Sequence, residues 1–241
     1  MKTRYVQINQ IILVGTSHIA EESIKNVAAV IEQFQPCIVG IELDKGRFYS
    51  LINEKEQTSS FSWQHIKTFG VKGYIFAIIA STISKKLAKI VGTKPGDDML
   101  SAIKTARKNH LTIALLDQPI NITLKRFSQT LTWKEKWNFF VDIFSGLFFP
   151  QSQIKKYGLT DFDLKKVPPE KVIITMLEFV KHRYPNIYKI LIEERNIYMT
   201  KKIKQFQQKY PDKIIVAVIG AGHIEGISIL LKQEIKKTNL Q

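Results

Sequence analysis

The sequence has one cysteine and lacks long uncharged apolar runs. Cys37 cannot form a disulfide within the chain, so nothing demands an oxidising compartment. We interpret it as a small apolar side chain in a buried strand. The longest uncharged apolar stretch, residues 73–84, is about half the length that a bilayer crossing requires. No apolar segment typical of a signal peptide follows the charged N-terminus, so we expect neither a leader nor a membrane span.

Negative charge is also scarce. Lys and Arg number 36 against 21 Asp and Glu, which gives a formal net charge of +15. Such an excess indicates an anionic membrane surface, nucleic acid, or only a lysine-rich composition with solvated side chains. We favour the last interpretation, because the lysines are spread along the chain. No arginine-aromatic module of the kind that reads RNA or DNA is present, so no nucleic acid is expected as a partner.

The 241 residues are 44% hydrophobic and 24% charged, which is typical of a folded globular chain rather than a disordered one. Two tetrads of the form Gly-x-x-His stand out. Gly15-Thr16-Ser17-His18 follows the apolar run 11–14, and Gly220-Ala221-Gly222-His223 follows the apolar run 214–219. Each run is typical of a buried strand, each glycine marks its exit, and helix-compatible sequence comes next. The chain therefore predicts paired strand–GxxH–helix units.

The remaining pattern predicts an α/β fold with a mainly parallel central sheet and large helical insertions. Runs that are apolar on both faces belong in a parallel sheet covered by helices. The expected domain is a single one, 1–241, with mainly helical insertions at about 60–110 and 131–185. Asp44 and Asn121 are expected helix caps. The expected strands cover 10–14, 37–43, 111–116 and 214–219, and the expected helices cover 21–34, 45–53, 66–91, 99–109, 122–130, 133–149, 168–182, 187–210 and 224–235.

Polar side chains fall where the expected strands end: His18, Glu42 with Asp44, Asp117 and His223. In an open parallel sheet, ligands bind outside the carboxyl ends of the strands, so these groups converge if their strands are neighbours. Two imidazoles and a carboxylate suit a catalytic divalent metal or a metal-free acid/base site. The structural alternative also stays open: the histidines cap helices, Glu42 pairs only with Arg47, and Asp117 is satisfied by the turn 118–121.

Two helices are unusually apolar, 74–89 and 139–149. Core packing explains most such positions. The second helix is apolar nearly all round, which favours burial in a homodimer interface or contact with lipid over a one-sided surface helix.

Six collinear blocks of this sequence resemble the TraB family, the group that includes the pheromone-shutdown protein PrgY and is distantly related to the Tiki proteases and to the erythromycin esterase/ChaN-like superfamily. The resemblance spans nearly the whole chain. The blocks are IILVGTSHIAEES (11–23), IVGIELDKGRF (38–48), YIFAIIASTISKKLAKIVGTKPGDDMLSAIKTAR (74–107), IALLDQPINITLKRF (113–127), LIEERNIYM (191–199) and VAVIGAGHIEGI (216–227).

The resemblance implies a metal-dependent hydrolase, a peptidase acting on short peptides, with manganese, cobalt or zinc as the cofactor. It assigns His18, Glu42 and His223 as metal ligands or acid/base groups, and Gly15, Gly220 and Gly222 as the contacts of a bound cofactor. Supporting charges around the cleft would be Arg47, Asp117, Arg126, Glu194 and Arg195. The alternative is a non-catalytic protein that sequesters a peptide or another ligand. Gln118 and Asn196 depart from the charged residues that the family usually carries at these positions.

The resemblance also bears on location and partners. We expect a cytoplasmic or membrane-peripheral protein, or the soluble domain of a longer membrane protein. The expected partners are a short peptide, a membrane surface, and a second copy of the chain through 74–89 or 139–149.

Overall fold

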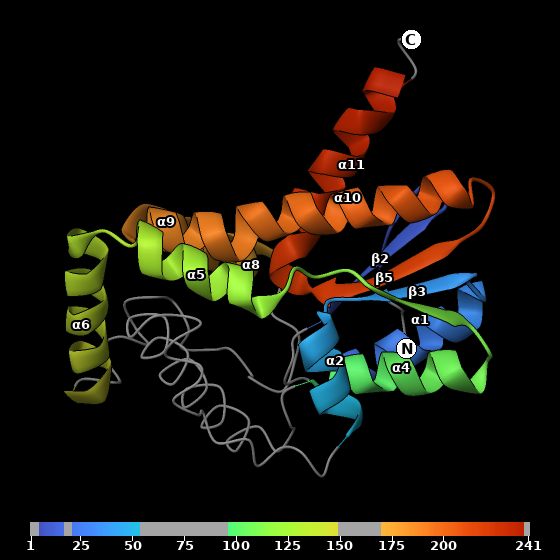
Figure 1. Ribbon diagram of the computed structural model, residues 1–241, viewed down its shortest axis with the longest axis horizontal. Helices are drawn as coiled ribbons and strands as arrows, with labels where there is room; N and C mark the ends of the chain where they lie inside the picture. The colour runs from blue at the N-terminus through green and yellow to red at the C-terminus, as the bar shows by residue number, and fades with distance from the viewer. Residues whose placement is uncertain (1–4, 17–20, 54–95, 149–169, 239–241) are drawn as a thin grey trace.

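The computed structural model describes residues 5–16, 21–53, 96–148 and 170–238 (Figure 1). His18, the predicted helix 66–91 and the apolar stretch 74–89 lie outside these residues. The core of the fold is a five-stranded sheet in the order β1-β2-β5-β3-β4. The strands are β1 (Val6–Ile8), β2 (Ile11–Thr16), β3 (Ile38–Ile41), β4 (Thr112–Leu115) and β5 (Ile215–Gly220).

Three of the four strand pairings in this sheet follow the predicted parallel arrangement. β5 lies between β2 and β3 and is parallel to both, and β3 is parallel to β4. The two strands that precede the GxxH tetrads are therefore neighbours, with Thr16 paired to Gly220. Only β1 is antiparallel, at the edge beside β2. The sheet thus brings the first and the last predicted strand side by side, although about 200 residues separate them.

Helices cover both faces of the sheet, which confirms the α/β class (Figure 1). One face packs against α1 (Glu21–Phe34), α2 (Lys45–Ile52) and α4 (Asp97–Lys108), and the other packs against α10 (Glu194–Lys209) and α11 (Ile224–Thr238). Side chains alternate between the two layers, so that Val216 and Val218 face α1 and α4 while Ala217 and Ile219 face α10 and α11. Burial on both faces explains why these strands are apolar throughout.

The other described helices extend from one end of the sheet (Figure 1). They are α5 (Ile120–Thr130), α6 (Trp133–Phe148), α8 (Glu170–Arg183), α9 (Pro185–Tyr188) and a π-helical turn, η2 (Lys189–Glu193), that leads into α10. A separate apolar cluster holds α5, α8, α9 and η2 together around Phe127, Tyr184, Ile187 and Ile190. A short 3₁₀ turn, η3 (Ala221–His223), joins β5 to α11.

Several local predictions need correction. The hairpin strand β1 was not predicted, because three residues are too few to show a period. Asn121 does not cap α5: the helix begins at Ile120, and the carbonyl of Pro119 accepts the first bond, from the N–H of Ile122. The predicted helix 187–210 is interrupted by the π-helical turn η2.

The Asp44 cap of α2 is confirmed, since its carboxylate accepts hydrogen bonds from the N–H groups of Gly46 and Arg47.

The apolar helix α6 is partly described. Its first two turns expose Trp133 (81%) and Trp137 (68%), whereas Asp142 pairs with Arg183 through two hydrogen bonds of 2.6 and 2.7 Å. Most side chains of 139–149 lie outside the described part, so the expected homodimer interface stays a prediction. No described helix is long and apolar enough to cross a bilayer.

Candidate functional site

The carboxyl ends of the parallel strands meet at one edge of the sheet, and charged side chains gather there. Glu42 follows β3, Asp117 follows β4, and His223 follows β5. A fourth contribution comes from the start of α10, which packs across the end of β5 and supplies Arg195 and Asn196. All but Arg195 are at least nine-tenths buried, and the Arg195 side chain is only 14% exposed. We call these five residues the edge cluster.

Arg195 is the centre of the edge cluster. Its Nε donates to Oδ1 of Asp117 at 3.0 Å, and its Nη2 donates to Oδ2 of the same residue at 2.6 Å. Nη2 also donates to Oε1 of Glu42. Nη1 donates to the carbonyl of Leu191 at 3.3 Å and lies 3.2 Å from Nε2 of His223. These contacts use all five N–H groups of the guanidinium, so the protein itself satisfies the buried charge.

The guanidinium of Arg195 is positively charged despite its burial. Burial opposes the charged form, but the negative charges of Glu42 and Asp117 and their hydrogen bonds outweigh it, so the pKa of the guanidinium lies above its ordinary value. Removing either carboxylate would leave a buried cation without half of its compensation.

His223 has a defined tautomer in this arrangement. Its Nδ1 lies 2.6 Å from Oδ1 of Asn196, and an amide oxygen can only accept, so Nδ1 carries the proton. Nε2 then presents its lone pair, to which Nη1 of Arg195 donates. His223 is therefore placed as a neutral imidazole, with Nε2 directed at the carboxylate of Glu42, 3.5 Å from Oε1. This is the state that a metal ligand or a general base needs.

Glu42 is fixed from two sides. Oε2 accepts a hydrogen bond of 2.5 Å from the N–H of Gly220, the first residue of the second tetrad, while Oε1 faces Arg195 and His223. The structural alternative that pairs Glu42 with Arg47 is therefore wrong. Arg47, in the first turn of α2, instead bridges the capping residue Asp44, at 2.6 Å from Nε, and Asp117.

Asp117 joins the two arginines. Both Arg47 and Arg195 donate to its carboxylate, and the N–H of Gln118 adds a bond of 2.8 Å to Oδ1. The prediction that the turn 118–121 satisfies the carboxylate of Asp117 is therefore correct for one hydrogen bond only. Gln118 itself turns away, and its amide donates to the hydroxyl of Thr123 at 2.9 Å.

Arg126 and Glu194 form an ion pair that is more exposed than the edge cluster. Glu194 directly precedes Arg195 in the sequence. Nε of Arg126 donates to Oε2 of Glu194 at 3.2 Å, and Nη2 donates to Oε1. The pair ties α5 to the start of α10. The two hydrogen bonds make this a bidentate ion pair. It lies near the surface, because 42% of the Arg126 side chain remains exposed.

The predicted glycines have different surroundings. Gly220 reaches the cluster through its N–H. Gly15 packs tightly instead, because a Cβ there would lie 3.0 Å from Ile224. Gly222 is in ordinary contact with Leu177, at 3.7 Å from the position of a Cβ. The role of these three glycines toward a cofactor stays a prediction.

Two features of the cluster were not predicted from the sequence. The π-helical turn η2 leads directly into Glu194, whose N–H donates to the carbonyl of Lys189 five residues back, and such turns are frequent at functional sites. Gly226 leaves room for Asn196, because a Cβ there would lie 2.2 Å from Nδ2 of that side chain. The Gly-x-x-His-x-x-Gly spacing of 220–226 is a signal that could have indicated this contact.

The donor chemistry fits a divalent cation in two respects. Nε2 of His223 and Oε1 of Glu42 are 3.5 Å apart, close to the ~3.4 Å that separates two tetrahedral ligands about 2.1 Å from one ion. Asn196 supplies the outer hydrogen bond that orients a ligating imidazole. Arg195 contacts both ligand atoms, so its guanidinium would have to withdraw toward Asp117. The described residues contain no group of three metal-binding side chains, and the third predicted ligand, His18, lies outside them.

The fold and this cluster define a class: an α/β protein with a buried ionic network and a neutral histidine at the carboxyl edge of a parallel sheet. The model of the TraB/PrgY/gumN family matches residues 5–238, and the chain belongs to this family. It is 35% identical over 225 residues to an uncharacterized protein of Methanocaldococcus jannaschii, covering 92% of this chain and 53% of that protein.

Animal relatives are more distant. TraB domain-containing proteins of Bos taurus and Homo sapiens are 25% and 24% identical over 241 residues, covering 91% of this chain and 62% of theirs. The chain therefore spans about half to three-fifths of the length of these relatives.

Proposed function

We propose that this protein is a metal-dependent hydrolase that acts on short peptides, with His223 and Glu42 as two of its metal ligands and His18 as the third. The observation that carries the proposal is the approach of two donor atoms from neighbouring strands, Nε2 of His223 and Oε1 of Glu42, to 3.5 Å. The parallel pairing of β2 with β5 supports the third ligand, because His18 follows the strand next to that of His223.

The described side chains supply three kinds of help to such a reaction. Asn196 accepts a hydrogen bond from Nδ1 of His223, and this selects the tautomer in which Nε2 is the coordinating nitrogen. In the alternative in which Glu42 acts as a base rather than a ligand, Oε1 accepts the proton while the N–H of Gly220 holds the carboxylate through Oε2. When bound, a divalent ion supplies Lewis acidity toward the scissile carbonyl. Asp117 gives the guanidinium of Arg195 an anchor that does not depend on Glu42.

The arginines differ in what they can offer a substrate. Arg195 is committed to partners within the protein. Arg47 and Arg126 have side chains that are 37% and 42% exposed, so they are the groups that can meet a substrate carboxylate or a developing oxyanion.

The second candidate function is sequestration of a peptide or another ligand without chemistry. The observation that favours it is the guanidinium of Arg195, which contacts the same two atoms that an ion would need. The two functions differ in one measurable property, the uptake of a divalent ion at neutral pH.

The decisive experiment combines metal binding with peptide turnover. Protein purified without chelators is titrated with Mn²⁺, Co²⁺ or Zn²⁺ and incubated with a peptide library, and products are detected by mass spectrometry. His223→Ala should lose both metal uptake and cleavage, whereas His182→Ala, at an exposed position of α8, should retain both. Activity should also fall on acidification, because protons compete for the imidazole ligands.

Equal turnover by His223→Ala and the parent would overturn the hydrolase proposal. Retention of peptides by a protein that takes up no metal would establish the second function instead. His18→Ala then tests the third ligand separately.

A further inference from the structure

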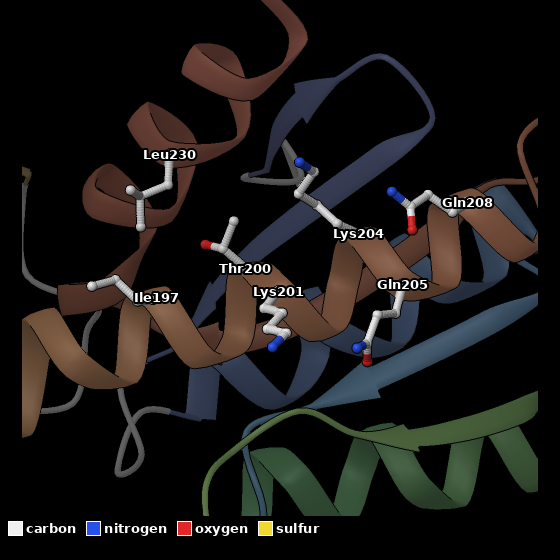
Figure 2. A pocket seen from close by; sticks show the side chains of 7 residues that line it. All are labelled: Ile197, Thr200, Lys201, Lys204, Gln205, Gln208 and Leu230. Atoms are coloured by element: carbon white, nitrogen blue, oxygen red, sulfur yellow. The ribbon is translucent and has the colours of Figure 1, made fainter. Parts of the chain in front are cut away.

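A hollow that shares no residue with the edge cluster lies between α10 and α11. Its volume is about 360 Å³, and Figure 2 shows the seven side chains that line it. Six come from one face of α10, where they follow one another at intervals of one or three residues, and one comes from α11. They are Ile197, Thr200, Lys201, Lys204, Gln205, Gln208 and Leu230. None of the seven is acidic. We call this the α10–α11 pocket.

The strongest sign of a ligand is the hydroxyl of Thr200. The residue is 5% exposed, and its Oγ1 has no hydrogen-bond partner. A buried polar group without a partner carries a cost, so such groups call for a specific explanation. Thr200 lines the pocket, so its hydroxyl lies beside the space that a ligand would occupy. Ser228 Oγ, on the facing helix α11, is likewise buried without a partner.

The positive charge around the pocket favours an anionic ligand. Between Glu194 and Asp212 the chain carries no carboxylate, while Lys201 and Lys204 line the pocket and Lys202 and Lys209 lie on the same helix. Gln205 and Gln208 add amide donors. Ammonium, amide and hydroxyl groups together form a donor set for an oxyanion with several acceptor oxygens.

The apolar members restrict the ligand further. Figure 2 shows Leu230 extending from α11 toward α10, and Ile197 lies at the end of the lining nearest the start of α10. Ile197 is 60% exposed, so it offers apolar surface that the fold does not cover. A ligand that fits both parts has an oxyanion head and an apolar group beside it.

We propose that the α10–α11 pocket binds a phosphate monoester that carries an apolar group. Lys201 and Lys204 would neutralise the phosphate, Thr200 would donate its unused hydroxyl hydrogen, and Ile197 and Leu230 would contact the apolar group. The same chemistry is found in soluble phosphate esters and in the headgroup of phosphatidic acid. This site is independent of the peptidase proposal, because none of its residues belongs to the edge cluster.

The test uses phenyl phosphate as a soluble probe and vesicles of phosphatidylcholine with or without phosphatidic acid. Binding is measured by calorimetry, or by vesicle sedimentation, at about 0.15 M salt, where non-specific surface attraction is largely screened. We expect saturable binding of phenyl phosphate, tighter than that of inorganic phosphate. Binding only to vesicles with phosphatidic acid, with the same dependence on the variants below, supports the site and identifies a lipid source.

Matched variants separate the pocket from general basicity. K201Q/K204Q should weaken binding by about tenfold, because it removes two charge-assisted contacts. K202Q/K209Q removes the same charge from α10 outside the pocket, where these lysines lie over Tyr198 and Tyr210, and should change binding less than about twofold. Equal weakening by both pairs would overturn the proposal, as would the absence of saturable binding to either probe.

Thr200→Val provides a further check. Replacing the hydroxyl by a methyl group should weaken binding severalfold and leave the melting temperature of the ligand-free protein unchanged, because no hydrogen bond within the protein is lost. A lowered melting temperature would show that the fold itself bonds this hydroxyl, and that result counts against the site.

Discussion

Replacement of Arg195 by methionine tests the ionic network most directly. The side chain is 14% exposed and compensates two carboxylates that are 3% and 2% exposed, those of Glu42 and Asp117. Asp117 keeps Arg47 as a charged partner, whereas Glu42 loses the guanidinium and keeps the hydrogen bond from the N–H of Gly220. Breaking a buried ion pair on one side costs about 3–5 kcal/mol, because a charge is left buried. We therefore expect Arg195→Met to lose about that much free energy of unfolding.

This loss is large for a folded protein, whose total stability is about 5–15 kcal/mol. For a chain of this size it corresponds to a decrease of roughly 6–20 °C in melting temperature. The assay is urea unfolding at pH 7, with the denaturant slope compared to confirm that the same surface is exposed. Arg107→Met is the matched control, because Arg107 is exposed on α4 and should stay within about 0.5 kcal/mol of the parent.

A double-mutant cycle locates the cause. Adding Glu42→Gln to Arg195→Met removes the uncompensated charge, so the pair should be at least about 1 kcal/mol more stable than additivity predicts. If Arg195→Met unfolds at the same urea concentration as Arg107→Met, the guanidinium does not compensate buried charge and our description of the edge cluster is wrong.

Two further predictions concern packing and pH. Gly226→Ala should lower the free energy of unfolding by about 1–3 kcal/mol, because its Cβ would lie 2.2 Å from Nδ2 of Asn196; melting curves should show Gly222→Ala, with 3.7 Å of room, unaffected. Burial opposes ionisation of Glu135, but hydrogen bonds from Asn186 and Thr132 prevail and lower its pKa. A lowered carboxyl pKa stabilises the fold above the unfolded value of about 4.3 and loses that effect as pH falls through the folded value. Urea midpoints of the parent and Glu135→Gln should therefore differ at pH 7 and converge toward pH 3.

The strands were predictable because each carries its own local signal. β3 and β5 are continuous apolar runs; β3 lies within the predicted stretch 37–43, and β5 overlaps the predicted stretch 214–219 but extends one residue further, to Gly220. The edge strand β1 was missed because three residues in a hairpin carry no period. Asp44 was predictable as a cap, since the bond from a capping carboxylate spans only two or three residues.

The partners of the charged residues were not predictable in the same way. Local spacing pairs Glu42 with Arg47, five residues away, but the fold pairs it with Arg195, 153 residues away. Nothing in the local sequence distinguishes these arginines. The selection follows from α10 packing across the end of β5, and the π-helical turn η2 leads directly into the residues that contribute to the cluster.

The sequence alone determined the α/β class, the parallel strands and the family, because apolar runs, glycine exits and motif order are local properties of the chain. It also determined that polar groups stand at the strand ends. Only the tertiary structure decided which strands are neighbours, and therefore that Glu42 and His223 face one another across 3.5 Å. The physical reason is that hydrogen bonds and ion pairs act over a few ångströms in space, whatever the separation along the chain, and the sheet order sets those distances.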